Sequence, residues 1–254
     1  MTFSQRDGTE RWNRNAEAWH RNYGENDPSR RYLLDPVIME VLGDVRGKQI
    51  LDAGCGDGYL SRKLARAGAA VTGVEFSAGM LGFALLGQKT DPLPITYHHG
   101  NISRMPFLPG ASFDVAVTNN VIQDTADYEA AFREFNRVLK PGGTYLHIEN
   151  HPCFTMPVFG WVKDEQGNRL YKKVDRYFER GPFITPWGPR SGMEPSVYWH
   201  RTLADVMNSL ISAGFRIARV IEPEITESVV AAHPFMADEL RVPDFLALVC
   251  RKEG

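Results

Sequence analysis

Apolar residues along the chain fall into two patterns: short unbroken runs, and longer stretches in which apolar positions recur every three or four residues. The first pattern predicts buried strands and the second predicts helices. The N-terminal segment shows the helical pattern, with apolar residues at intervals of four, three and four: Trp12, Ala16, Trp19 and Tyr23. A second helix is expected from Asp35 onward. Because an apolar helical face must pack on something, residues 1–47 are expected to form a helical cap.

The two patterns alternate through the next hundred residues. Apolar runs predict five strands, at residues 49–53, 69–75, 95–98, 113–118 and 144–149. Helical spacing lies between them, at residues 59–67, 77–86 and 128–139. Near the C-terminal end, a helix is expected at 202–213 and two more strands at 215–221 and 245–250. Strands that alternate with helices at this spacing form a mostly parallel sheet covered on both faces, so we expect a doubly wound α/β fold.

Residues 151–200 show neither pattern, and prolines, glycines and aromatic residues accumulate there. A structureless loop of this length is unusual inside a compact domain, so we expect an ordered insertion with a hairpin around residues 164–168. Its rings either enclose a substrate or form a small core beneath a long loop. The aromatic residues are Phe154, Phe159, Trp161, Tyr171, Tyr177, Phe178, Phe183, Trp187 and Tyr198.

The composition of the 254 residues argues against several classes of function. With 29 Lys and Arg against 31 Asp and Glu, the formal net charge is −2, which leaves no positive excess for binding nucleic acid. Three cysteines without CxxC spacing argue against a disulfide framework and a structural zinc site, so no metal is expected. No run approaches the ~18 apolar residues of a membrane span and no signal peptide is evident, so the expected location is cytoplasmic.

Residues 51–58 read Leu-Asp-Ala-Gly-Cys-Gly-Asp-Gly and join the first predicted strand to a helix. Glycines at this point let the backbone approach a ligand, and the helix start offers free N–H groups, although many such turns need glycine only to turn. Glu75 closes the next strand, where folds of this class bind ribose hydroxyls. The dinucleotide pattern GxGxxG fails because Tyr59 stands at its sixth position, so NAD is disfavoured, and no GxxxxGK[ST] motif occurs.

Residues 51–58 resemble motif I of the class I S-adenosylmethionine-dependent methyltransferases. Three further segments resemble later motifs of that family in the same order. Residues 71–81 resemble the second motif, residues 113–121 (Phe-Asp-Val-Ala-Val-Thr-Asn-Asn-Val) resemble motif IV, and residues 138–144 (Val-Leu-Lys-Pro-Gly-Gly-Thr) resemble the motif before strand five. The resemblance implies a Rossmann-like seven-stranded sheet whose last strand is antiparallel, and S-adenosylmethionine as cofactor.

The resemblance also implies the organisation of the chain as one methyltransferase domain. Its parts would be the helical cap (1–47), a cofactor-binding half (48–150), the insertion (151–200), and a C-terminal helix with two strands (201–254). The insertion is expected to act as a substrate lid, although it would serve equally well as a contact in a homodimer.

Ten residues would contact the cofactor if the family's roles carry over to the matching positions: Tyr23, Asp52, Gly54, Cys55, Gly56, Glu75, Phe76, Asn101, Ile102 and Asn119. Glu75 would accept hydrogen bonds from both ribose hydroxyls, and Phe76 would lie against the adenine. Asn101 stands where the family often has an acidic residue, and its side-chain oxygen can still accept from the adenine amino group. The backbone of Asn119 would face the methionine moiety, unless this residue only caps the next turn.

A sulfonium methyl group is already electrophilic, so its transfer requires alignment and, for hydroxyl or carbon acceptors, removal of a proton. Three histidines are the candidate bases. His151 follows strand five, His200 precedes the last helix, and His20 lies on the cap. Each also has a purely structural interpretation, as a residue that fixes a turn or caps a helix.

The sequence therefore predicts methyl transfer to an oxygen, nitrogen or carbon atom of a small, apolar or aromatic metabolite. The alternative is a protein of the same fold that binds S-adenosylmethionine without transferring its methyl group, as a cyclase, an isomerase or a ligand sensor. The intact glycine turn and Glu75 favour cofactor binding in either case.

Overall fold

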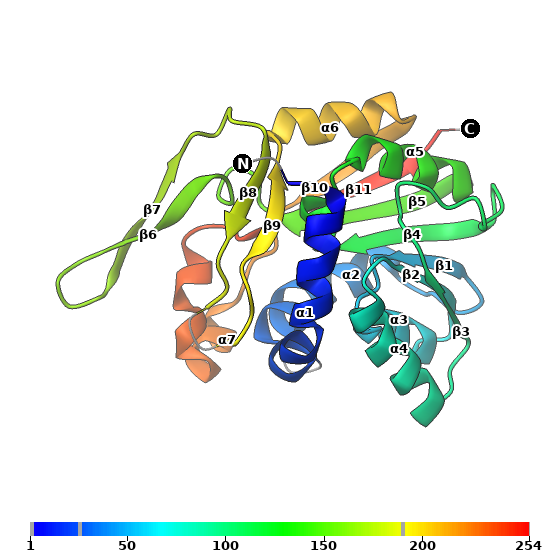
Figure 1. The fold of residues 1–254 in the computed structure, drawn as a ribbon, viewed down its shortest axis with the longest axis horizontal. Helices are drawn as coiled ribbons and strands as arrows, with labels where there is room; N and C mark the ends of the chain where they lie inside the picture. The colour runs from blue at the N-terminus through cyan, green and yellow to red at the C-terminus, as the bar shows by residue number, and fades with distance from the viewer. Residues whose placement is uncertain (1–2, 25–26, 189–190, 254) are drawn as a thin grey trace.

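The computed structural model describes residues 3–24, 27–188 and 191–253. Its centre is one sheet of seven strands in the order β10-β11-β5-β4-β1-β2-β3 (Figure 1). The strands are β1 (Gln49–Ala53), β2 (Ala70–Glu75), β3 (Ile95–His99), β4 (Phe113–Asn119), β5 (Leu139–Asn150), β10 (Phe215–Ile221) and β11 (Phe245–Lys252). Only β11 runs antiparallel to its neighbours, β5 and β10. The predicted mostly parallel sheet with an antiparallel last strand is confirmed.

Helices cover both faces of this sheet. The helices of the described residues are α1 (Gln5–Tyr23), α2 (Asp35–Leu42), α3 (Tyr59–Arg66), α4 (Ala78–Thr90), α5 (Tyr128–Val138), α6 (Leu203–Ser212) and α7 (Glu227–Ala232), with short turns η1 (Arg30–Leu34), η2 (Ile122–Asp124) and η3 (Pro234–Leu240). Successive side chains of β1 point to opposite faces of the sheet, so the core has two parts. Leu51 packs with α5 and α6 on one face, and Ile50 packs with α2 and α3 on the other. Both faces are therefore buried, as a parallel sheet requires.

Polar side chains fix where several helices begin. The hydroxyl of Ser77 accepts a hydrogen bond from the backbone N–H of Met80 at 3.2 Å and starts α4 directly after β2. Thr202 and Asp205 form a capping box that starts α6. These local signals explain why the sequence pattern located both helices.

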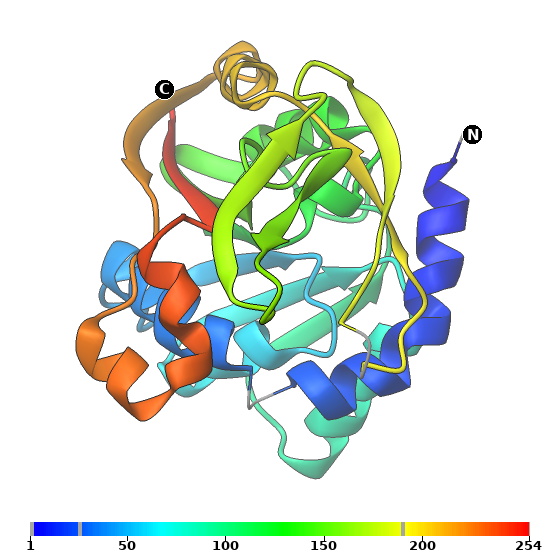
Figure 2. The same ribbon diagram turned by 90° about the vertical axis from the view of Figure 1, so that its left-hand side faces the viewer.

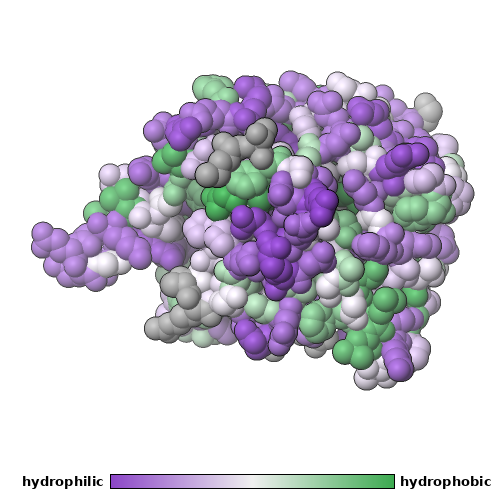
Figure 3. Space-filling view, viewed as in Figure 1, coloured by the Kyte–Doolittle hydropathy of each residue, from purple (hydrophilic) through white to green (hydrophobic). Residues whose placement is uncertain are grey.

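The insertion after β5 folds into two hairpins. The first, β6 (Val158–Lys163) with β7 (Arg169–Asp175), turns at residues 164–168 as predicted and forms an arm that projects from the body (Figures 1 and 3). The second, β8 (Gly181–Thr185) with β9 (Ser196–His200), was not predicted. Gly181 and Pro182 disfavour a strand locally, but every residue of β9 is buried, so tertiary packing imposes the extended conformation.

The β8–β9 hairpin lies beside α1 (Figure 2). The side chain of Asn15 donates to the backbone oxygen of Glu194 and accepts from its N–H, both at 2.8 Å. Trp187 packs edge-on against Trp12 and Trp19, with ring centroids 6.0 and 5.3 Å away. The cap and the insertion are thus joined into a single cover. In the parts of the chain that the structure describes, no helix is long and apolar enough to cross a membrane.

Candidate active site

The turn after β1 brings the backbone close to a cavity. Gly54 has a φ of +76°, and a Cβ there would collide with the side chain of Val121. The N–H groups of Gly54 and Cys55 both donate to the carbonyl of Val74, at 2.7 and 3.1 Å, which ties the turn to β2. Glycine is required at position 54 because of both its conformation and its close neighbour.

Glu75 ends β2 and is 4% exposed. One of its carboxylate oxygens accepts from the N–H of Gly56 at 2.9 Å, and the other accepts from the N–H of Ser77 at 2.8 Å. Burial raises the pKa of Glu75 to about 7, against the lowering effect of these backbone donors. A carboxylate oriented in this way retains lone pairs for further donors, such as hydroxyl groups.

Asp52 lies at the end of β1, next to Glu75 in the same wall. Its carboxylate accepts from the hydroxyl of Ser61 at 2.6 Å, and burial raises its pKa to about 6. Two neighbouring buried carboxyl groups favour a ligand that brings hydrogen-bond donors or positive charge.

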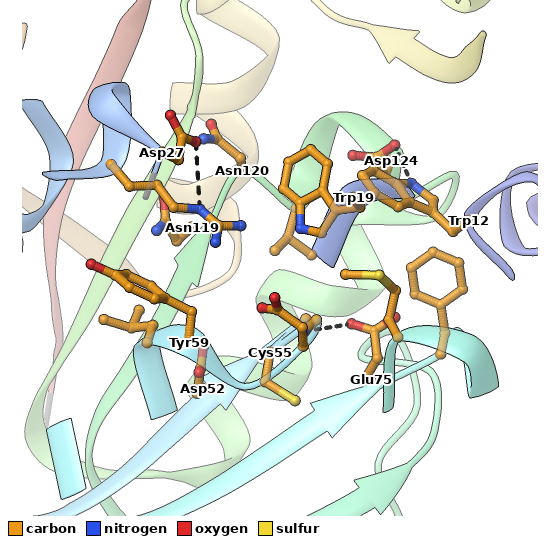
Figure 4. A pocket seen from close by; sticks show the side chains of 18 residues that line it. Trp12, Trp19, Asp27, Asp52, Cys55, Tyr59, Glu75, Asn119, Asn120 and Asp124 are labelled. Atoms are coloured by element: carbon orange, nitrogen blue, oxygen red, sulfur yellow. Dashed lines mark hydrogen bonds and ion pairs between the residues drawn. The ribbon is translucent and has the colours of Figure 1, made fainter. Parts of the chain in front are cut away.

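These residues line one cavity at the carboxyl ends of β1, β2 and β4, which we call the main pocket (Figure 4). Ligands of doubly wound folds bind at this edge. Seven of the ten residues predicted to contact a cofactor line it: Asp52, Gly54, Cys55, Gly56, Glu75, Phe76 and Asn119. The N-terminal segment contributes the opposite side of the lining, including Trp12, Trp19, Asp27 and Arg30.

Arg30 is the one Lys or Arg among the described residues that line the main pocket. Its guanidinium lies 5.1 Å from the ring centroid of Trp19 and 5.2 Å from that of Tyr59, and it donates to the carbonyl of Tyr23 at 3.0 Å. Aromatic faces on either side hold a guanidinium in place and favour its charge. The sequence analysis missed Arg30, because nothing in the local pattern shows that η1 directs it toward the glycine turn.

Asp124, on η2, is a second residue that the sequence analysis missed. Its carboxylate accepts from the indole N–H of Trp12 at 2.9 Å, and burial raises its pKa to about 8 (Figure 4). The pair joins the cap to the sheet at the wall of the main pocket. No sequence motif indicates the contact between Trp12 and Asp124, because the two residues are 112 positions apart in the chain.

Three further polar atoms of the main pocket are buried without a partner among the described residues: the indole nitrogen of Trp19 and the side-chain oxygens of Asn119 and Asn120. Buried polar atoms in proteins are nearly always hydrogen-bonded. Together they offer one donor and two acceptors to a ligand.

Three predicted contact residues lie outside the main pocket. Asn101 is exposed, and its side-chain oxygen accepts from the N–H of Ser103 at 2.9 Å. Ile102 is part of the core next to α5. The ring of Tyr23 packs on Trp19, with centroids 4.9 Å apart. Roles for these three in binding remain predictions.

None of the three histidines predicted as bases is among the residues that line the main pocket. The Nδ1 atom of His20 lies 3.0 Å from the carboxylate of Asp57, which does line it, and its ring stacks on Phe83. His151 has partners on both ring nitrogens, the carboxylate of Glu222 at 3.0 Å and the N–H of Cys153 at 3.2 Å.

His200 donates from Nε2 to the carbonyl of Tyr177 at 2.7 Å. Burial lowers the pKa of both His151 and His200, which favours neutral rings. A catalytic role for any of the three histidines remains a prediction.

Comparison with known proteins identifies the class. A family model described as a methyltransferase domain matches residues 51–147. The ubiquinone biosynthesis O-methyltransferase of Nitrosococcus oceani is 30% identical over 188 residues, which cover 70% of this chain and 78% of that protein. The crystal structure of an S-adenosylmethionine-dependent methyltransferase from Mesorhizobium loti has a TM-score of 0.74 and 32% identity, covering 85% of this chain and 96% of that one. An uncharacterized protein of Haemophilus influenzae is 28% identical over 76% of each chain.

The chain is thus a methyltransferase with S-adenosylmethionine as its cofactor. It belongs to the class I S-adenosylmethionine-dependent methyltransferases of the small-molecule type. The predicted family, enzyme class and cofactor are confirmed.

Proposed function

We propose that this enzyme transfers the methyl group of S-adenosylmethionine to an oxygen, nitrogen or carbon atom of a small, apolar or aromatic metabolite. The observation that carries the proposal is that a buried carboxylate, Glu75, and a positioned cation, Arg30, line one pocket beside the glycine turn. Ribose hydroxyls would donate to Glu75, and the carboxylate of the methionine moiety would pair with Arg30.

The residues of the main pocket fit this cofactor. The unpartnered atoms of Trp19, Asn119 and Asn120 would bond the polar groups of the methionine and ribose moieties. Phe76 offers a ring for the adenine, and the acidic Asp52 favours the positively charged end of the cofactor.

When bound, the cofactor supplies an electrophilic methyl group, so the chain mainly has to align an acceptor and exclude water. The rings of Trp12 and Trp19 line the main pocket on the side of the cap, and Trp187 of the insertion packs against both. An aromatic cover of this kind suits an apolar or ring-bearing acceptor. The relative from Nitrosococcus oceani is named for ubiquinone biosynthesis, which supports an acceptor with a ring.

Two measurements test the proposal. The first is calorimetric titration of the purified chain with S-adenosylmethionine and, separately, with NAD; we expect micromolar affinity for the former alone. The second is detection of S-adenosylhomocysteine by mass spectrometry after incubation with a panel of phenols, quinols, amines and activated carbon acids. Preference for NAD would refute the cofactor site. Tight cofactor binding without transfer to any class of acceptor would favour the cyclase or sensor alternative.

A further inference from the structure

The main pocket holds one carboxyl group that the proposed cofactor contacts do not use. Among the described residues, five carboxyl side chains line it, against one cation. Four of the five either pair with a charged, imidazole or hydroxyl group of the chain or are assigned to the ribose: Asp27, Asp52, Asp57 and Glu75. The fifth, Asp124, bonds one described side chain, the neutral indole of Trp12.

One carboxylate oxygen of Asp124 is open to a bound molecule. Its Oδ1 atom accepts from Trp12, and no described residue donates a hydrogen bond to Oδ2. The residue is 4% exposed, but Oδ2 is not among the unpartnered atoms that protein encloses completely. Because Asp124 lines the main pocket, a molecule bound there is placed to donate to Oδ2 (Figure 4).

Neighbouring side chains hold Asp124 in position. Arg201 donates to the carbonyls of Ile122 and Thr125, which lie on either side of Asp124 in the chain. Gln5 of the cap donates to the carbonyl of Asp124 itself at 3.0 Å. A group that takes a proton has to be oriented toward it by such contacts, so Asp124 meets the geometric requirement for a general base.

The charges around Asp124 suit the same role. Burial raises its pKa to about 8, and the charge of Glu75 on β2 adds to this effect, whereas the bond from the indole and the charge of Arg201 oppose it. Tyr198 of β9 lies within range of its charge, and Glu149 of β5 acts on Arg201. A general base works best with a pKa near the working pH. Since the pKa of a phenol is about 10, a phenolic proton can pass to this carboxylate.

We propose that Asp124 is the catalytic base of the methyl transfer, and that the acceptor is a phenolic hydroxyl whose ring lies against Trp12 and Trp19. The acceptor oxygen forms a bond to the methyl carbon, and the bond from that carbon to sulfur breaks with its electron pair left on sulfur. The hydroxyl proton moves to Oδ2 of Asp124, which later releases it to solvent.

The proposal rests on the proposed function and narrows its acceptor to a hydroxylated aromatic ring. It gives Asp124 the role for which the sequence pattern indicated three histidines, none of which lines the main pocket.

Turnover of Asp124→Asn is the first test, with the phenol or quinol of the acceptor panel that the wild type methylates fastest. The asparagine keeps an acceptor for Trp12 but cannot take a proton. We expect kcat to fall about a hundredfold or more, with much smaller changes in KM and in calorimetric affinity for S-adenosylmethionine. Wild-type kcat should rise with pH through about pH 8, as Asp124 loses its proton, and this rise should be absent in the variant.

Asp127→Asn is the matched control, because it makes the same chemical change three positions away. Asp127 is exposed, accepts from the N–H of Ala130 at the start of α5 and lies outside the main pocket. Asparagine caps a helix as well as aspartate does, so this variant should keep its kcat and its pH profile.

Binding gives a second test that needs no turnover. Phenol is compared with anisole, which carries a methoxy group in place of the hydroxyl, by ligand-observed NMR on the chain saturated with S-adenosylhomocysteine. At pH 9 the wild type should bind phenol about tenfold more tightly, because the hydroxyl donates to a carboxylate. The preference should shrink at pH 6, where Asp124 is protonated, and should not vary with pH in Asp124→Asn.

Turnover of Asp124→Asn within threefold of the wild type, or a pH profile that the substitution leaves unchanged, would overturn the proposal. Equal wild-type affinity for phenol and anisole at pH 9 would also overturn it, and this result decides the matter if no phenol is methylated or if the variant does not fold. Failure of the chain to bind S-adenosylhomocysteine would instead refute the proposed function, and the role of Asp124 would fall with it.

Discussion

Glu75→Gln changes the proposed ribose contact while leaving the shape of the side chain nearly intact. Hydrogen bonds to a charged acceptor contribute about 1.5–3 kcal/mol, and those to a neutral acceptor about 0.5–1.5 kcal/mol. The loss is therefore about 1 kcal/mol for each ribose hydroxyl and about 2 kcal/mol for both. At about 1.4 kcal/mol for each factor of ten, affinity for S-adenosylmethionine should fall about thirtyfold.

The structure adds a second cost. Both carboxylate oxygens of Glu75 accept backbone N–H groups, from Gly56 and Ser77. A glutamine has one oxygen, so one of these N–H groups would face the amide NH₂ and lose its acceptor. Melting temperature should fall as well, since an unsatisfied buried donor costs about 1–3 kcal/mol.

Calorimetry at pH 8, above the pKa of Glu75, gives the affinity. Glu134→Gln is the matched control, because Glu134 also accepts a backbone N–H, from Met105 at 2.7 Å, but lies outside the main pocket. It should lose stability and keep its cofactor affinity. As pH falls from 8 to 6, Glu75 becomes protonated and the difference between wild type and Glu75→Gln should shrink. Unchanged affinity of Glu75→Gln at pH 8 would refute the ribose assignment.

Three further substitutions follow from the site. Arg30→Gln removes the cation held by Trp19 and should weaken cofactor binding at least tenfold in calorimetry; melting temperature should fall as well, because the carboxylate of Asp27 loses its partner at 3.8 Å. Gly54→Ala forces a methyl group against Val121 at a φ of +76° and should destabilise the fold by at least about 2 kcal/mol in urea unfolding. Asp124→Asn keeps an acceptor for Trp12. The pKa of Asp124 is raised in the folded state, so its contribution to stability is lost as pH rises from about 4 to about 8. Because Asp124→Asn cannot ionise at this position, the melting temperature of the variant relative to that of the wild type should rise over the same interval.

The elements predicted from the sequence are those whose signals are local. Residues 49–53 and 113–118 are apolar runs bounded by turn residues, and both form central strands. The glycine turn and Glu75 were located because each follows a strand directly. The local sequence is enough to place such residues in the site, because the carboxyl ends of parallel strands lie at the same edge of the sheet and ligands bind there.

Contacts between distant segments could not be predicted in the same way. Arg30 reaches the main pocket, and Trp12 reaches Asp124, only because η1 and α1 fold over the edge of the sheet. The short α7 and η3 gave too few residues for a periodic pattern. His151 does follow β5 as expected, but the chain turns it toward Glu222 rather than toward the main pocket. A position at the edge of a sheet does not determine where a side chain points.

The most direct test of the account is a crystal structure of the chain with S-adenosylhomocysteine. We expect the ligand in the main pocket, with its ribose hydroxyls on Glu75, its carboxylate on Arg30 and its adenine beside Phe76. A ligand bound elsewhere, or one whose ribose lies away from Glu75, would contradict the assignment of the site.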